Sequence, residues 1–194
     1  MLDSRKELLD KIRLGEDSYL EYKDVRFSGE RVSEPLDAQI EGACRFVARN
    51  MKVAAFKDLG RRDLPRFDMT AVFGAVVNAV AHRDYAIHGA KVRLRLFENR
   101  LELHSPGAIP NGMSVENLAY LQSARNDVVM SLLARCAVPA DVPWLSTDRR
   151  TLTDRRGEGV RLILENSERL SGRTPEYRLV DDAELMLTIH AAGE

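Results

Sequence analysis

The sequence predicts an α+β fold, a two-layer sandwich in which helices pack on one face of a mixed sheet. Three observations support this prediction. Apolar residues recur at helical spacing in several segments, strict alternation of apolar and polar residues marks others, and the two kinds of segment follow one another in mixed order. This order is typical of helices gathered on one face of a largely antiparallel sheet.

The composition is that of one globular unit with almost no net charge. Of the 194 residues, 44% are hydrophobic and 30% are charged, and the formal net charge is −1. Nucleic-acid contacts would therefore have to come from local clusters of charge. Cys44 and Cys136 lie in helical patterns far from a second metal-type ligand, so we expect two buried, reduced thiols. No apolar run reaches membrane-spanning length and no secretory signal is present, so we expect a cytoplasmic protein.

The segment that ends at Pro35 predicts a helix and one strand. Apolar residues at helical spacing indicate a helix over 3–14, and alternation indicates a short strand over 19–23. A polar stretch rich in charge, Ser and Gly follows over 24–35. We place the boundary with the main domain at Pro35.

The next segment holds two helices that are expected to build the core. Residues 36–51 have one apolar face, a short strand is expected over 52–57, and RRDLPRFD is interpreted as a connector. A second helix is expected to begin near Asp68 or Thr70 as its N-cap. It runs through AVFGAVVNAVAHRDY (71–85) with one apolar side.

The rest of the chain predicts a hairpin, further helices and two closing strands. Two alternating runs joined by an Asn-containing turn are a strong signal of a β-hairpin. In order, we expect hairpin strands at 92–96 and 101–103, a loop over 105–112, helices at 114–119 and 126–136, a connection over 137–156, a helix at 159–170, and strands at 177–179 and 185–189.

A polar cluster lies at the end of the second helix. Asn78 and His82 are four residues apart, so they project from the same helix face about one turn apart, and Asp84 follows directly. Unpaired polar groups are costly among apolar neighbours, so these side chains either satisfy nearby backbone groups or face a ligand pocket. The residues alone favour the first interpretation.

Four runs, in this order, carry a family resemblance: VVNAVAHRDYAIHG, LELHSPGAIPNG, SARNDVVMSLLARC and GEGV. They resemble the ATP-binding domain of a family of bacterial transcriptional regulators, some described as helicase-related. In that family a Schlafen AlbA-type DNA-binding domain precedes a histidine-kinase-like GHKL ATPase domain. Four motifs in sequence are far more specific than one. The resemblance implies the Bergerat fold of the GHKL ATPases.

The resemblance also implies how the chain is divided. Residues 36–194 correspond to the GHKL-like ATP-binding domain. Residues 1–35, in which GEDSYLEYKDV is similar to the first strand of the AlbA-type domain, correspond to a remnant of that domain. An AlbA-type domain is a separate folding unit of ordinary size, so we expect most of it to be absent.

The resemblance assigns roles within the polar cluster. In the wider ATPase superfamily this helix carries a Glu that activates water and, four residues later, an Asn that holds Mg²⁺. Asn78 occupies the Asn position and is the expected metal ligand, whereas Gly74 stands where the Glu would be. His82 and Asp84 are expected to line the same site. Loss of a general base costs about 10²–10⁴ in rate, so hydrolysis is expected to be weak or absent.

Two loops complete the expected site for ATP. In the superfamily an Asp-x-Gly-x-Gly loop binds adenine, with the Asp accepting the amino proton. Ser105 and Gly107 occupy the Asp and first Gly positions here. Gly157 and Gly159 open the following helix, where exposed N–H groups and the helix N-terminus favour a phosphate.

These assignments lead to three hypotheses. The leading one is an ATP-binding domain of a DNA-linked transcriptional regulator. The alternative is a pseudo-ATPase scaffold for dimerisation or partner binding, because Gly74 and Ser105 both lack the superfamily's carboxylates. The third is a slow ATPase in which Glu102, His82 or Asp84 replaces the missing base. Expected partners are a nucleotide, a second copy of the chain, and DNA in the full-length protein, with no membrane.

Two arginine clusters lie in predicted loops, one within 61–66 and the other within 149–156. Either could neutralise the phosphates of DNA or of a nucleotide. Solvated loop charge is the more frequent role of such clusters. The second cluster directly precedes GEGV and is the better candidate for contacting phosphate.

Overall fold

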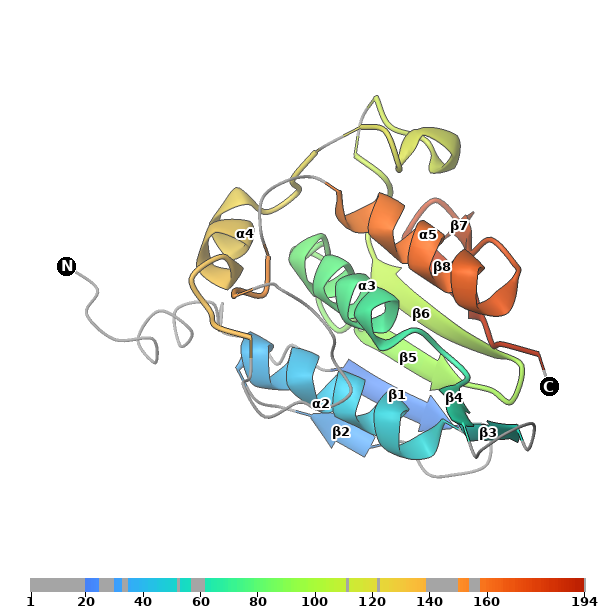
Figure 1. The fold of residues 1–194 in the computed structure, drawn as a ribbon. Coiled ribbons are helices and arrows are strands. Elements are labelled where there is room, and N and C mark those ends of the chain that lie inside the picture. The colour runs from blue at the N-terminus through green and yellow to red at the C-terminus, as the bar shows by residue number, and fades with distance from the viewer. Residues whose placement is uncertain are drawn as a thin grey trace.

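The computed structural model describes residues 20–24, 30–32, 35–51, 53–56, 62–110, 112–121, 123–138, 150–153 and 158–193. The helix predicted over 3–14, the candidate Gly157 and most of the 137–156 connection lie outside the described residues. Helices pack on one face of a sheet in the described part (Figure 1), which confirms the predicted α+β class.

The main sheet has six strands in the order β2-β1-β5-β6-β8-β7. In chain order they are β1 (Leu20–Asp24), β2 (Glu30–Val32), β5 (Val92–Leu96), β6 (Arg100–Pro106), β7 (Glu176–Val180) and β8 (Glu184–His190). β1 pairs with β5 in parallel and the other neighbours are antiparallel, so the sheet is mixed, as predicted. β1 and β2 precede Pro35 and continue the sheet that the rest of the chain builds. That this segment is a remnant of an AlbA-type domain stays a prediction.

Three helices, α2 (Leu36–Asn50), α3 (Met69–Ala81) and α5 (Gly159–Ser171), lie across one face of the sheet (Figure 1). The central helix α3 contacts α2, α5 and β6. Eleven of its 13 residues are buried, and only Thr70 and Asn78 are not. Because other elements pack against almost every side of α3, the half-buried Asn78 marks a place where the helix is accessible to solvent.

Both ends of α3 are fixed by side chains. Its N-cap is Asp68, one of the two predicted, whose carboxylate accepts a hydrogen bond from the Ala71 N–H at 2.8 Å. The helix ends at Ala81, four residues before the predicted end. There the Asn126 amide donates to the carbonyl oxygens of Ala81 and Arg83 at 2.9 and 2.8 Å. The last carbonyls are therefore satisfied from outside the helix.

The interpretation of RRDLPRFD as a connector is wrong. Its middle forms β4 (Arg62–Pro65), which pairs antiparallel with β3 (Val53–Phe56) in a separate two-stranded sheet. The segment has no alternation of apolar and polar residues, so only its pairing with β3 makes it a strand.

Two predicted helices are shorter in the structure. The segment expected to be helical over 114–119 is one 3₁₀ turn, η1 (Val115–Asn117), closed by a capping box between Ser114 and Asn117. The helix predicted over 126–136 is reduced to α4 (Asp127–Leu133). Short polar segments carry too little periodicity to fix their ends.

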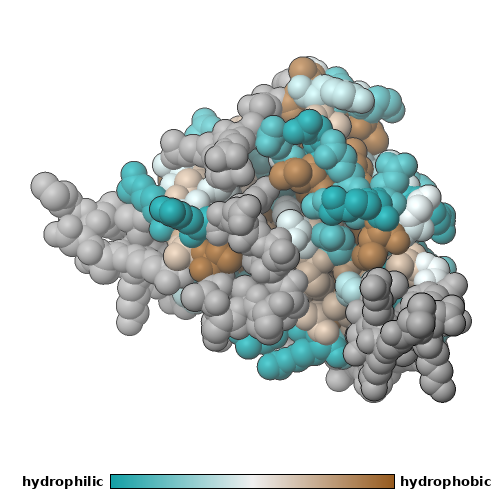
Figure 2. All heavy atoms as spheres, viewed as in Figure 1, coloured by the Kyte–Doolittle hydropathy of each residue, from teal (hydrophilic) through white to brown (hydrophobic). Residues whose placement is uncertain are grey.

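Three further observations describe the molecule as a whole. Cys44 and Cys136 are buried and neither forms a disulfide, as predicted. None of the helices in the described part of the chain has the length and apolar character that crossing a bilayer requires. In the space-filling view, hydrophobic atoms reach the surface in small separate groups among hydrophilic ones (Figure 2).

Candidate functional site

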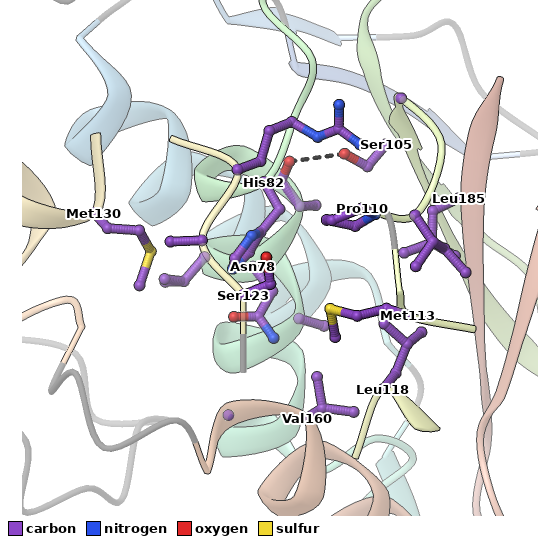
Figure 3. A pocket seen from close by; sticks show the side chains of 18 of the residues that line it. Asn78, His82, Ser105, Pro110, Met113, Leu118, Ser123, Met130, Val160 and Leu185 are labelled. Atoms are coloured by element: carbon purple, nitrogen blue, oxygen red, sulfur yellow. Dashed lines mark hydrogen bonds between the residues drawn. The ribbon is translucent and has the colours of Figure 1, made fainter. Parts of the chain in front are cut away.

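A cleft of about 640 Å³ opens at Asn78. Its walls come from α3, the N-terminus of α5, the β6 and β8 strands, and the loop between β6 and α4. In Figure 3 the side chains of Asn78 and His82 project from α3 into the space bounded by Pro110, Met113 and Leu185. A cavity of this volume is large enough for a ligand of nucleotide size.

The Asn78 amide faces the N-terminus of α5. A Cβ added at Gly159 would lie 3.3 Å from Oδ1 and 3.4 Å from Nδ2 of Asn78, so a glycine lets the helix begin this close to the amide. The amide makes no side-chain hydrogen bond with any residue that the structure describes. A helix N-terminus carries a partial positive charge and unpaired N–H groups. This end of the cleft is therefore suited to an anion, with one amide oxygen and one amide N–H beside it.

Gly74 lies one turn before Asn78 and also lines the cleft. A Cβ at this position would lie 3.3 Å from Cγ1 of Ile163, so the glycine allows close contact between α3 and α5. Among the described residues that line the cleft, Asp127 is the only carboxylate. The position expected to carry a general base therefore has no side chain, and no neighbouring wall residue of α3 or α5 supplies one.

His82 lies one turn after Asn78 and lines the cleft. Its ring makes no hydrogen bond with the described residues. Burial lowers the pKa of His82 below its ordinary value, and the positive charge of Arg125 lowers it further. The ring is therefore neutral at neutral pH and offers one N–H donor and one acceptor to a ligand.

The next residues of the motif have structural roles. The Arg83 guanidinium donates to the Ala90 carbonyl at 2.7 Å and lies over the Tyr85 ring, 4.7 Å from its centre. The Tyr85 hydroxyl donates to the Val80 carbonyl at 2.9 Å. These contacts fold the chain back against α3 directly after the helix ends.

Asp84 does not line the cleft, although it was a candidate binding residue. Its Oδ1 accepts from the Ala86 N–H at 2.9 Å, and its Oδ2 pairs with Nη1 of Arg125 at 3.1 Å. Arg125 also donates to the Ala108 carbonyl. One carboxylate oxygen thus closes the turn after α3, and the other holds Arg125 in the loop that forms one wall of the cleft.

Ser105 and Gly107 lie where β6 ends, and both line the cleft. The Ser105 hydroxyl donates to the Ala79 carbonyl at 2.8 Å, which is the dashed line in Figure 3. Gly107 has φ +119°, and a Cβ there would lie 2.8 Å from Cβ of Asp84. Glycine is needed at this position by backbone conformation and close packing alone.

Glu102, a candidate replacement base, lies on the opposite face of the sheet. Side chains alternate along β6, and Leu103 and Ser105 point to the cleft. Glu102 accepts instead from Nε of Arg100 at 2.7 Å. Of the three candidate replacement bases, only His82 lines the cleft.

The floor of the cleft is apolar and is set by strand register. Leu103 of β6 pairs with Leu187 of β8, which in turn pairs with Tyr177 of β7, so the three form one row across the sheet. Ser105 and Leu185 form part of the next row. Cross-strand neighbours lie about 5 Å apart, so these rows make a continuous surface on which a flat ring could rest.

The walls of the cleft combine an apolar floor with the helix N-terminus of α5. Magnesium usually binds through one or two carboxylates together with phosphate oxygens and water. Within the described residues no group of three or more His, Cys, Asp or Glu could hold a metal ion. Asn78 could therefore hold Mg²⁺ only together with a bound phosphate.

Sequence reasoning missed several polar residues of the cleft, among them Arg125, Thr153 and Tyr177. Arg125 lies within a motif run, but its pairing with Asp84 spans 41 residues and has no sequence signal. The Thr153 hydroxyl is buried and makes no hydrogen bond with described residues. Tyr177 is one member of an alternating strand, and only its strand partners place it at the cleft.

Comparisons with known proteins agree with this fold. The structure of the DIP2311 protein from Corynebacterium diphtheriae is similar, with a TM-score of 0.71 and 20% sequence identity over 91% of this chain. At this identity the likeness shows the fold alone, and this chain covers 35% of the length of that protein. No curated protein matches.

The family described as "Putative ATP-dependent DNA helicase recG C-terminal", HATPase_c_4, matches residues 89–189, which is 101 of 194 residues. The match begins after α3, so Asn78 and Gly74 lie outside it. It includes the loop after β6, helix α5 and the closing strands. The predicted GHKL-type fold is confirmed, and the chain belongs to this family of ATPase-like domains.

Proposed function

We propose that the cleft binds ATP together with Mg²⁺ and that the domain senses the nucleotide rather than turning it over. One observation carries the proposal: the Asn78 amide has no partner among described residues and faces the α5 N-terminus across Gly159. Asn78 is only half-buried and lines the cleft, so its amide can be reached by a ligand. An amide left open beside a helix N-terminus is best explained by a phosphate-bearing ligand.

The residues divide the work of binding. The N–H groups at the start of α5 donate to phosphate oxygens, the Asn78 oxygen is a ligand for Mg²⁺, and neutral His82 donates one N–H. Bound Mg²⁺ would neutralise phosphate charge. The leucines of the floor exclude water from the base.

Weak or absent hydrolysis is part of the same proposal. Gly74 leaves the water-activating position without a side chain. A missing general base lowers the rate by about 10²–10⁴. Among the described residues that line the cleft, His82 and the Asp127 carboxylate could accept a proton from water, so residual turnover would depend on one of these two.

Thermal melting tests the binding proposal directly. A ligand that binds only the folded state raises the melting temperature. At a concentration 100 times its dissociation constant, it raises the free energy of unfolding by about 2.7 kcal/mol. We expect ATP and ADP to raise the melting temperature, and EDTA to reduce the shift. Gly159→Ala should reduce the shift because its Cβ crowds the Asn78 amide. Gly193→Ala is the control, since an added Cβ there meets nothing within 4 Å.

A pseudo-ATPase scaffold is the second candidate, and Gly74 and Ser105 favour it. Both positions lack the carboxylate that the superfamily uses for hydrolysis or for the adenine amino group. A scaffold of this kind would self-associate or bind a protein, and no nucleotide would change its melting temperature. The melting series therefore separates the two candidates.

We also propose that the domain serves a DNA-linked cytoplasmic regulator. The matched family is described as the C-terminal part of a DNA helicase, and the chain covers about a third of the similar solved protein. The chain's net charge of −1 gives little non-specific attraction to DNA. In a gel shift at low salt we expect this chain alone to bind DNA weakly, and tight salt-sensitive binding would contradict that expectation.

A further inference from the structure

The walls of the cleft, in the described part of the chain, include a single carboxylate, that of Asp127. A carboxylate repels phosphate groups, so its presence in a cleft for nucleotides calls for an electrostatic explanation. Resting on the proposed function, we infer that Asp127 makes nucleotide binding depend on a divalent cation. Its charge opposes the bare phosphates and attracts the Mg²⁺ that accompanies them.

The position of Asp127 is fixed by the residue before it. The Asn126 side chain donates to the carbonyl oxygens of Ala81 and Arg83, at 2.9 and 2.8 Å. These two carbonyls belong to the residues on either side of His82 in the chain. Asp127 therefore begins α4 beside the end of α3.

One face of α4 sets the direction of the carboxylate. Asp127, Met130 and Ser131 all line the cleft, and spacings of three and four residues place them on one side of the helix. Val129 and Leu133 are buried in the core. Because the core fixes how α4 is rotated, the Asp127 side chain is held on the cleft side.

The charge of Asp127 is not offset by a neighbouring cation. Its side chain is exposed, and it makes no hydrogen bond or ion pair with the residues that the structure describes. Arg125, the cation among the described walls of the cleft, is already paired with Asp84 at 3.1 Å. An acidic residue in the first turn of a helix also stabilises that helix. That role alone would leave nucleotide affinity unchanged.

The same charge acts in opposite directions on two forms of the ligand. The Debye length at physiological ionic strength is about 8 Å, so a ligand that fills the cleft feels the charge of its walls. ATP without metal brings negative phosphates toward Asp127 and loses affinity. Mg²⁺ is bound in proteins by one or two carboxylates together with phosphate oxygens and water. One carboxylate is therefore enough when the phosphates are present, and MgATP gains affinity from it.

Isothermal titration of the whole chain with ATP, in excess Mg²⁺ or in EDTA, tests the inference. In Asp127→Asn we expect the dissociation constant of MgATP to rise about fivefold and that of metal-free ATP to fall about threefold. The ratio of the two constants, which measures the cation dependence, then falls about 15-fold.

Two further variants serve as controls. Asp127→Glu keeps the charge and should stay within about twofold of the parent chain for both forms of ATP. Asp37→Asn is the matched control, because Asp37 is the acidic residue in the first turn of α2 and lies outside the cleft walls. It should leave both affinities unchanged.

The outcomes separate this inference from the proposed function. If Asp127→Asn changes both affinities equally, in either direction or not at all, Asp127 has no part in the cation dependence and the inference is overturned. Nucleotide binding by the parent chain would still stand in that case. If the parent chain binds neither form of ATP, the proposed function fails, and this inference fails with it.

Discussion

Two groups of polar residues lie near the C-terminal end of α3. They differ in whether their side chains form hydrogen bonds with the rest of the protein. Asp84, Arg125 and Asn126 form the staple, in which each side chain hydrogen-bonds to another part of the protein. Asn78 and His82 form the open pair, whose side chains make no hydrogen bond with described residues. In the sequence the two groups look alike, because all five residues fall within two short motif runs.

The difference shows how a binding motif divides into support and contact. A satisfied polar side chain stabilises the fold, and replacing it leaves a partner unpaired. A side chain open to a cleft stabilises nothing until a ligand arrives. Substitutions in the staple should therefore change stability, whereas substitutions in the open pair should change ligand binding. Four experiments test this division, beginning with Gly74, the position that lacks the expected general base.

The largest effect is expected at Gly74. Gly74→Glu places a carboxylate one turn before Asn78, and we expect ATP hydrolysis to rise by about 10² or more over the parent chain. Phosphate release under saturating ATP measures it. Gly74→Gln is the matched control, with nearly the same shape and no base. If both variants stay at the parent rate while still binding ATP, the phosphate end of the cleft does not position water for attack.

Steric fit at this position is a separate matter. An added Cβ lies 3.3 Å from Ile163, a tight contact that requires a small shift of that side chain. Combining Gly74→Glu with Ile163→Ala removes both Cγ1 and Cδ1 of that side chain and provides room. A gain seen only in the double variant would show that helix packing, rather than chemistry, limits the single one.

The next largest effect is expected in the staple. Asn126→Ala removes two hydrogen bonds to the end of α3 and should lower the free energy of unfolding by about 2 kcal/mol. Urea denaturation measures it. Asn166→Ala is a control, because Asn166 accepts only an exposed hydrogen bond from Arg169. Equal stability of the two variants would mean that the staple does not hold the helix end.

A smaller effect, of opposite kind, is expected for Asn78→Ala. We expect MgATP affinity to fall about tenfold, as for the loss of one charge-assisted contact. The melting temperature without nucleotide should not fall, because the amide has no described partner and alanine favours the helix. A destabilised variant with normal ATP affinity would move Asn78 from the open pair to the supporting residues.

The smallest effect concerns pH and His82. Since the folded-state pKa of His82 lies below its ordinary value of 6.5, the unfolded chain binds the proton more readily. Stability is therefore full above about pH 6.5 and falls as the pH drops below it. His82→Asn should make urea midpoints less sensitive to pH in this window. A residual slope is expected, because His104 has a pKa shifted in the same direction.

Adding nucleotide makes the pH dependence of the urea midpoints a test of where His82 lies relative to the phosphates. Negative phosphate charge near His82 would favour its protonated form, so MgATP should reduce the loss of stability at low pH. If the slope is the same with and without ATP, His82 does not face the phosphates.

Much of the fold could be predicted from local sequence. Periodicity located α2, α3, α5 and the strands of the β5–β6 and β7–β8 pairs to within a few residues. Periodicity did not predict β4, which is a strand because it pairs with β3. It also did not predict η1, which is one 3₁₀ turn closed by a capping box. The order of the strands in the sheet could not be predicted from local sequence. The parallel β1–β5 pairing, for example, joins segments that are far apart in the chain.

The candidate site divides in the same way. The sequence by itself determined the missing carboxylate at Gly74 and the pairing of Asn78 with His82 on one helix face, because helix geometry fixes which residues share a side. Only the tertiary structure decided that Asp84 is paired with Arg125, and that Tyr177 joins the floor of the cleft. Whether a polar side chain is satisfied depends on partners that are distant in sequence, and packing alone brings them together.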